Sequence, residues 1–313
     1  MRLGSFAPLR QLFPHLMTDP THSPVTYLER PFRVRHYECD AYGHVNHAHY
    51  LRYMQETAFD ASAAVGYDVA RYEAIGRQWL VRETDITYLR PLTYGDTVIV
   101  KTWVADFRRV RSRRDYALRL AGSGEPVATA SSEWVLLDSA TLRPVTIPPE
   151  MIAAFHHPGV AAGERRDPFP ATPPPPPGIF RARRRVEWRD IDPAQHVNNA
   201  NYLAYIEEGN VGVAAAHGWP MARMMAASLG IVARRYRIEY RQPALLDDEL
   251  EVTTYISDVK RATAVRHNTI RRVADGALLA RAHALWVFID LATGRPRRIP
   301  PDFIDAFQSN VAE

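Results

Sequence analysis

The chain has 313 residues, of which 46% are hydrophobic and 24% are charged. This length is typical of two domains of ordinary size, and the composition excludes disorder of the whole chain. The sequence has no run of the roughly 18 apolar residues that a transmembrane helix needs, so a membrane span is excluded as well.

Charge and cysteine content further limit the classes of function that the sequence allows. Only two of the 39 basic residues are lysine, a bias more typical of genome composition than of nucleic-acid binding. The net charge of +4 still favours anionic partners such as phosphates or an acidic carrier protein. Phosphate-loop, dinucleotide-binding and zinc-ligand spacings are absent, so no cofactor, metal or nucleic acid is expected. The single Cys39 fits a reducing compartment, and we expect a cytoplasmic protein.

Residues 1–30 are expected to form a disordered leader, and residues 31–156 a first domain. A short strand is predicted at 32–37, followed by a polar turn that holds Asp40 and His44. A helix is predicted from His47, where apolar residues recur at helical spacing. Segments rich in β-branched and aromatic residues predict strands at 79–88, 96–107, 115–121 and 127–137.

The same pattern returns later in the chain. His44-Val45-Asn46 recurs as His196-Val197-Asn198, an offset of 152 residues, and residues 130–155 match 282–307 at 14 of 26 positions without a gap. A period of this length corresponds to a whole domain rather than to a small repeat. A second domain is therefore predicted at 181–313, with a strand at 184–188 and a helix from Asn199.

Residues 157–180 separate the two copies and contain five consecutive prolines. Proline fixes φ and lacks an amide donor, so this linker is either an extended polyproline spacer or an ordered surface loop. In each copy one helix faces one antiparallel sheet. This is an α+β architecture, and we expect the sheet to curve strongly around the helix.

The turn and the helix start resemble a known family. The stretch Asp40-Ala-Tyr-Gly-His-Val-Asn-His47, followed by Tyr50-Leu-Arg-Tyr53, resembles the hot-dog-fold thioesterases of the 4-hydroxybenzoyl-CoA thioesterase type. Residues 192–199 are similar to the catalytic half of acyl-ACP thioesterases, which are tandem hot dogs. Those enzymes have an asparagine two residues after the aspartate, where this chain has Ala194, and a further glutamate that is absent near 240–243. Copy one is therefore the better match to a simpler site built around the turn aspartate.

The resemblance implies two tandem hot-dog domains, each a curved antiparallel sheet wrapped around a central helix. It implies hydrolysis of an acyl-CoA or acyl-carrier-protein thioester, with the turn aspartate as the essential carboxylate. It also implies that the two copies pair within one chain as a pseudo-dimer, which removes edge strands from solvent. Whether the whole chain forms a homodimer is left open.

Thioester hydrolysis needs one group that polarises the carbonyl and another that attacks it or activates water. The free N–H groups at a helix N-terminus supply the first, and Gly43 leaves room for the thioester beside the backbone. Asp40 supplies the second, as a general base or as a nucleophile. The candidate catalytic residues are Asp40, His44, Asn46, Asp192, His196 and Asn198. The candidate substrate-binding residues are Gly43, Tyr50, Glu56, Tyr202, Glu208, Arg109 and Arg261, the two arginines for phosphates or an acidic carrier.

Each assignment has a purely structural alternative. The aspartates and asparagines are also favoured as turn and helix caps, and the histidines as satisfied buried groups. The glutamates and arginines are also typical of a solvated helix face and of strand ends. The whole protein could then be a non-catalytic module that binds an acyl thioester or an acyl carrier protein.

Overall fold

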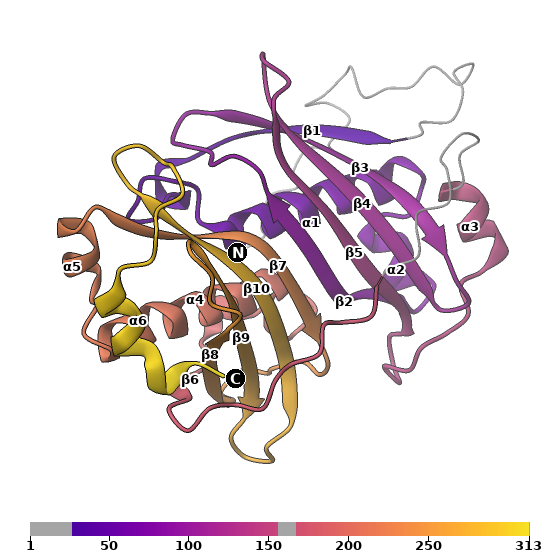
Figure 1. The fold of residues 1–313 in the computed structure, drawn as a ribbon. Helices are drawn as coiled ribbons and strands as arrows, with labels where there is room; N and C mark the ends of the chain where they lie inside the picture. The colour runs from indigo at the N-terminus through magenta and orange to yellow at the C-terminus, as the bar shows by residue number, and fades with distance from the viewer. Residues whose placement is uncertain (1–26, 156–166, 313) are drawn as a thin grey trace, which may run out of the picture.

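The computed structural model describes residues 27–155 and 167–312 (Figure 1). The first copy contains β1 (Leu28–Arg33), α1 (His47–Ala64), α2 (Val69–Ala74), β2 (Arg77–Tyr88), β3 (Thr97–Phe107), β4 (Arg111–Leu120), β5 (Pro126–Asp138) and α3 (Pro149–Phe155). The second contains β6 (Phe180–Arg185), α4 (Asn199–Ala216), α5 (Met221–Ala226), β7 (Leu229–Tyr240), β8 (Glu249–Ser257), β9 (Thr263–Arg272), β10 (Leu278–Asp290) and α6 (Pro301–Phe307). Of the leader predicted at 1–30, residues 1–26 lie outside the described residues, whereas Leu28–Arg30 belong to strand β1, so the disorder predicted for these three residues was wrong. Linker residues 157–166 also lie outside the described residues.

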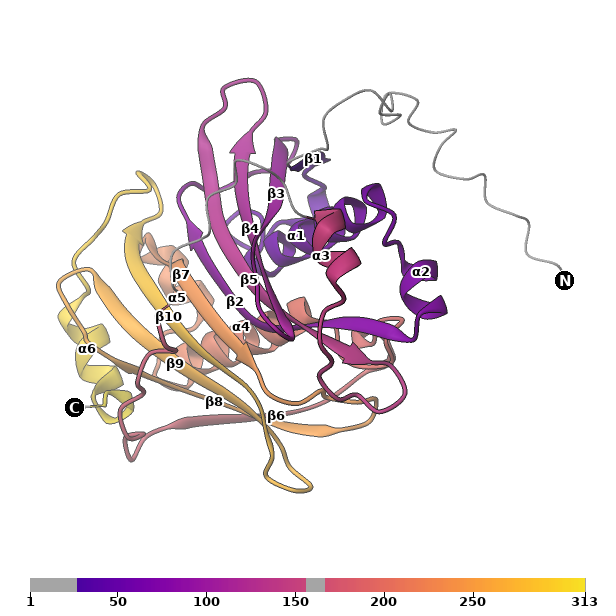
Figure 2. The ribbon, with the colours of Figure 1, turned by 90° about the vertical axis from the view of Figure 1, so that its right-hand side faces the viewer.

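The two copies share one continuous antiparallel sheet of ten strands, ordered β1-β3-β4-β5-β2-β7-β10-β9-β8-β6. The copies meet where β2 pairs with β7, in a register that places Ile86 opposite Tyr236. Helices α1 and α4 lie on the same side of this sheet and contact each other (Figure 2). The predicted α+β architecture with one long helix per copy is confirmed, and the copies pair within one chain.

The predicted first strand was misplaced. Strand β1 ends at Arg33, and His36–Glu38 form a short 3-10 turn instead. The reason is the buried Glu38 carboxylate, which accepts hydrogen bonds from the Arg35 amide and the Tyr53 hydroxyl, both at 2.7 Å. These bonds turn the chain inward toward α1, and Asp190 holds the Glu187 amide in the same way in the second copy.

Strand β4 begins four residues earlier than predicted. Ser112, Arg114 and Tyr116 alternate inward along it, whereas Arg111 and Asp115 face outward. The strand therefore includes residues 111–114, with charged side chains on its outer face. The short helices α2 and α3 were not predicted, because six or seven residues give too little periodicity.

Helices α1 and α4 each span 18 residues and bury an apolar face in the core. Leu51, Met54 and Ala58 from α1 and Leu203 and Ile206 from α4 are at most 5% exposed. Fully burying side chains of this size contributes roughly 1.5–3 kcal/mol each. The two helix starts are thereby fixed against the sheet, with the polar turns beside them.

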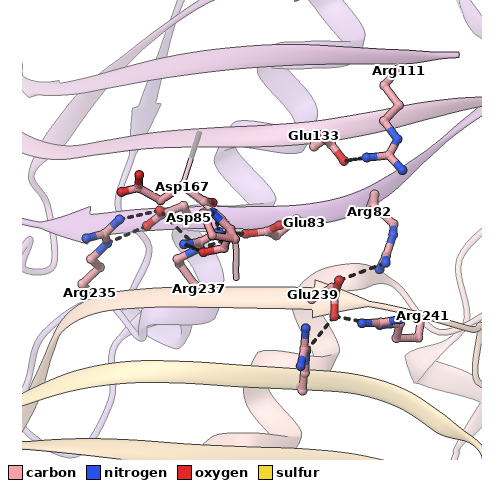
Figure 3. Close-up of polar contacts among 12 residues, drawn as sticks. Arg82, Glu83, Asp85, Arg111, Glu133, Asp167, Arg235, Arg237, Glu239 and Arg241 are labelled. Atoms are coloured by element: carbon pink, nitrogen blue, oxygen red, sulfur yellow. Dashed lines mark hydrogen bonds and ion pairs between the residues drawn. The ribbon is translucent and has the colours of Figure 1, made fainter. Parts of the chain in front are cut away.

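The outer face of the β2–β7 junction carries a network of ion pairs (Figure 3). Arg237, of which the side chain is 5% exposed, donates to Glu83 at 2.7 and 2.9 Å. Arg235 makes a two-pronged contact with Asp85, and Arg82 reaches Glu239 at 2.9 Å. Each of these pairs joins one copy to the other, so charge complementarity adds to the strand pairing.

The described part of the linker, residues 167–179, runs across the outer face of the sheet (Figure 1). Arg237 donates to the carbonyl oxygens of Asp167 and Pro168, and the Tyr255 hydroxyl donates to that of Pro173 at 2.6 Å. These bonds place the described residues of the linker in an ordered surface segment.

Candidate functional site

The turn at residues 40–46 is built around the Asp40 carboxylate. Its Oδ1 atom accepts the backbone amides of Tyr42 at 2.8 Å and His44 at 3.2 Å. Gly43 lies between them with φ +77°, a conformation that glycine adopts without strain, and a Cβ there would meet open space. The turn therefore fixes the carboxylate through one oxygen and leaves Oδ2 without a hydrogen bond among the described residues.

Asn46 begins α1. Its side-chain oxygen accepts the Ala48 amide at 2.9 Å, which is the usual cap geometry. From Tyr42 to His49, within the described structure, only the His47 backbone N–H has no hydrogen-bond partner. This amide stands at the positive end of the helix dipole, where negative charge is stabilised.

The second copy contributes a carboxylate to this turn. Glu207 projects from the third turn of α4 and accepts the Asn46 side-chain amide through Oε2 at 2.5 Å. Its other oxygen, Oε1, lies 3.5 Å from His47 Nδ1. Asn46, His47 and Glu207 thus form one cluster beside the Asp40 turn, and the charge of Glu207 acts on Asp40. We call these four residues the α1 site, and both copies build it.

Burial sets the electrostatics of the α1 site. Desolvation raises the pKa of Asp40, although its two backbone hydrogen bonds oppose the rise, and the nearby Glu207 charge adds to it. Desolvation also raises the pKa of Glu207. Burial lowers the pKa of His47 to about 4, so this imidazole is neutral at neutral pH. Its ring stacks on Tyr236 of the second copy with the centroids 5.3 Å apart.

The second copy forms a related but different cluster at the start of α4, the α4 site. Asp192 accepts the Ala194 amide at 2.9 Å, and Asn198 caps the helix. The Asn198 side-chain amide donates to Asp192 at 3.3 Å and to Gln55 of α1 at 3.1 Å. Gln55 occupies the place that Glu207 takes in the α1 site, so one site holds two carboxyl groups and the other holds one.

The two predicted histidines border these aspartates. His44 lies beside Asp40, and its backbone carbonyl accepts the Asp40 amide at 2.7 Å. His196 places Nδ1 3.8 Å from Asp192, while its buried Nε2 has no partner among the described residues. Position 195, which corresponds to Gly43, is a glutamine with φ +64°, so a side chain stands where the α1 site is open.

Several predicted binding residues lie away from both clusters. Tyr50 and Tyr202 are buried core residues, and the Tyr202 hydroxyl accepts the Ala244 amide at 2.8 Å. Glu56 and Glu208 are exposed, and Glu56 pairs with Arg30 at 3.5 Å.

Arg109 and Arg261 are exposed in the loops β3–β4 and β8–β9. Their backbone carbonyls accept the amides of Ile147 and Ile299, both at 2.9 Å. Strand β3 begins next to the Asp40 turn and is 11 residues long. At about 3.3 Å per residue it carries Arg109 about 36 Å along the sheet from that turn.

Sequence reasoning missed Glu207 and Gln55. Both stand next to the glutamates that were singled out, and both are related by the same repeat offset of 152. Gln55 and Glu207 differ in charge, whereas their neighbours Glu56 and Glu208 are identical. This difference in the sequence already indicated that the two sites are not equivalent. Which of the neighbours faces the site depends on the packing of α1 against α4.

Within residues 27–155 and 167–312, no three histidine, cysteine, aspartate or glutamate side chains gather as a metal site requires. No helix of that described part is long and apolar enough to cross a membrane.

The chain resembles known proteins over both copies. The profile of the acyl-ACP thioesterase N-terminal domain matches residues 26–155, and that of the thioesterase-like superfamily matches residues 186–307. The palmitoyl-acyl carrier protein thioesterase of Arabidopsis thaliana is 26% identical over 268 residues, which are 82% of this chain and 62% of that protein. This chain thus spans about three fifths of that plant relative.

A bacterial relative and a solved structure complete the comparison. The acyl-CoA thioester hydrolase YbgC of Escherichia coli is 31% identical over 130 residues, which are 42% of this chain and 96% of that protein. The structure of a 12:0-ACP thioesterase from Umbellularia californica shares the fold, with a TM-score of 0.66 and 24% identity over 84% of this chain and 95% of that one. The chain therefore belongs to the hot-dog thioesterase-like superfamily and carries two such domains in tandem, the first related to the N-terminal domain of acyl-ACP thioesterases.

Proposed function

We propose that the protein hydrolyses acyl thioesters of coenzyme A or of an acyl carrier protein, and that the α1 site performs the reaction. The observation that carries this proposal is the contact of Glu207, from the second copy, with Asn46 and His47 at the start of α1, next to the Asp40 turn and the unpaired His47 amide. Family membership supports the reaction class, since the relatives named above are thioesterases. The substrates in the names of those relatives, acyl-CoA and acyl-ACP thioesters, are the substrate class to test on this protein.

The thioester carbonyl is polarised first. The His47 N–H and the partial charge of about +0.5 at the start of α1 stabilise the negative charge that develops on the carbonyl oxygen. One well-placed donor of this kind lowers the activation barrier by about 3–4 kcal/mol. The open space beside Gly43 lets the thioester approach this backbone.

Asp40 then acts through its free Oδ2. As a general base it takes a proton from water, whose oxygen bonds to the acyl carbon; the carbon–sulfur bond then breaks, and the leaving thiolate takes up the proton from Asp40 and departs as the thiol. As a nucleophile its oxygen bonds to the acyl carbon and the carbon–sulfur bond breaks, which gives a mixed anhydride and a thiolate that takes a proton from water; a second water then hydrolyses the anhydride and restores the carboxylate. Both routes need an ionised Asp40 with a fixed orientation, which its Oδ1 bonds to Tyr42 and His44 supply.

Glu207 has a different role from Asp40 in this proposal. It holds the Asn46 side chain and lies against the neutral His47, so it orders the helix start from which the oxyanion donor comes. In the α4 site Gln55 supplies the same hydrogen bond without a charge, and Gln195 covers the turn. We therefore assign turnover to the α1 site.

Release of free thiol from purified protein tests the function across a panel of acyl-CoA and acyl-ACP thioesters. Turnover with at least one class is the expected result. The alternative is a binding module, and tight thioester binding without thiol release would establish it in place of the enzyme.

A further inference from the structure

A buried arginine inside the second copy has no acidic partner. Arg266 of β9 is 6% exposed, and its only hydrogen bond among the described residues goes to the Thr254 hydroxyl at 3.1 Å. Burial lowers the pKa of its guanidinium to about 10, which still leaves it charged at neutral pH. A buried cation without an anion costs several kcal/mol, so buried charges are ordinarily paired.

Arg266 belongs to a polar cluster between α4 and the sheet. Asn210 of α4 donates to the Tyr236 hydroxyl at 3.2 Å, and its side-chain oxygen accepts from Thr254 at 3.0 Å and from Asn268 at 2.9 Å. The Asn268 side-chain oxygen is buried and has no partner within the described structure. The cluster contains no carboxylate, so its net charge is positive.

The cluster continues from the α1 site. Arg266 on β9 lies opposite Ala284 on β10, and Ala284 lies opposite Tyr236 on β7. Strands are about 4.8 Å apart, so the backbones of Arg266 and Tyr236 are about 10 Å apart, with only the small Ala284 between them. Tyr236 packs on His47, and the charges of both Glu207 and Arg266 act on its hydroxyl.

We propose that the acyl pocket of the α1 site runs beneath α4 past Tyr236 and ends at Arg266, which binds a carboxylate at the far end of the acyl group. The proposal rests on the proposed function and names its substrate class as thioesters of dicarboxylic acids. A guanidinium suits this role, because its planar set of donors matches the two oxygens of a carboxylate.

The first copy offers a matched control. Arg114 occupies the equivalent position on β4, is 7% exposed and lies with its guanidinium carbon 5.8 Å from the centre of the Phe155 ring. The α1 residue at the position equivalent to Asn210 is Ala58, so the side-chain amide at the centre of the cluster is missing in the first copy. Changing Arg114 removes a buried arginine of the same kind while leaving the proposed pocket intact.

The test compares adipoyl-CoA with hexanoyl-CoA, which differ in the terminal carboxylate, by thiol release. The wild type is expected to favour adipoyl-CoA at least tenfold in kcat/KM. R266M is expected to lose that preference, measured as the ratio of the two kcat/KM values, and R114M is expected to keep it. R266K, which retains the charge, covers the case in which R266M does not fold, and it is expected to keep part of the preference.

Two results overturn the proposal and leave the hydrolase standing: a wild type that prefers hexanoyl-CoA, or an unchanged preference in folded R266M. If neither thioester is cleaved, the hydrolase proposal fails for these substrates. The role of Arg266 is then tested separately by calorimetric measurement of the binding of each thioester. Tighter binding of adipoyl-CoA that R266M abolishes would uphold the Arg266 subsite, and equal binding of the two thioesters would refute it.

Discussion

At the scale of single residues, the α1 and α4 sites differ in charge because Glu207 contacts Asn46 in the first and Gln55 contacts Asn198 in the second. The sequence predicted the turn aspartates and the capping asparagines, because they lie within one short motif whose local hydrogen bonds follow from residue type. It did not predict that Asn46 reaches Glu207, since that contact joins residues 161 positions apart. Such contacts depend on how α1 packs against α4.

Replacing Glu207 by glutamine gives the α1 site the same asparagine–glutamine contact that the α4 site has. Glutamine keeps the hydrogen bond to Asn46, so E207Q is expected to fold. Because it removes the carboxylate oxygen that lies against His47 Nδ1 at the helix start, E207Q is also expected to lose about tenfold or more in kcat/KM. Thermal melting checks that E207Q folds, and thiol release measures its loss of activity. The converse variant Q55E serves as a control and should leave turnover within threefold; a larger change would place the reaction at the α4 site.

The same variant should also change the dependence of stability on pH. The raised pKa of Glu207 means that the folded state binds a proton more readily than the unfolded chain. Its contribution to stability is therefore present in acid and is lost as pH rises from the ordinary value of 4.5 through the raised pKa. The melting temperature of E207Q should therefore change less with pH over that interval than that of the wild type. The same dependence on pH in both proteins would show that Glu207 is not desolvated.

Catalysis should respond to pH in the opposite direction. The rate needs ionised Asp40, so kcat/KM rises with pH through the raised pKa of Asp40, above its ordinary value of 3.8. Because the Glu207 charge contributes to that rise, E207Q is expected to move the acidic limb to lower pH. His47, with a pKa of about 4, should add no limb between about pH 5 and 8. A limb near pH 6.5 that disappears in H47Q would contradict this assignment.

At the scale of elements, the start of α1 performs two tasks through one side chain. Asn46 caps the helix at Ala48 and also holds Glu207. Asn198 caps α4 in the same way and holds Gln55. The caps and the helix starts at His47 and Asn199 could be predicted from the sequence. The position of the first strand could not, because the buried Glu38 that ends it acts through tertiary contacts.

N46A and N198A separate these tasks. Loss of a helix cap costs about 1 kcal/mol, so both variants should lose a similar amount of stability in denaturant unfolding. Only N46A also releases Glu207, and it is expected to lower kcat/KM at least tenfold further than N198A. Equal losses of activity in the two variants would mean that the cap alone matters.

At the scale of the whole molecule, duplication turns two incomplete domains into one sheet with shared sites. The repeat predicted pairing within the chain, but not that β2 and β7 would form the junction or in which register. That register depends on outward-facing charges such as Glu83 and Arg237 meeting across the junction, which no local pattern reveals (Figure 3). Because the α1 site draws on both copies, loosening this junction should affect stability and activity together.

The buried pair at the junction should outweigh an exposed pair of the same kind. E83A leaves the buried Arg237 without its closest carboxylate and is expected to cost about 3 kcal/mol of unfolding free energy. E133A breaks a pair in which Arg111 is half exposed, and it should cost less than about 1 kcal/mol. Both pairs appear in Figure 3. Equal losses in urea unfolding would show that the junction pair is solvated.

The most direct measurement is thiol release by D40N and D192N, each compared with the wild type on the best thioester from the panel. Both substitutions keep the turn hydrogen bonds, so both proteins should melt close to the wild type. D40N is expected to lose at least a hundredfold in kcat/KM, and D192N no more than a few-fold. A D40N protein that turns over like the wild type, or a D192N protein that alone is inactive, would contradict the assignment of the reaction to Asp40.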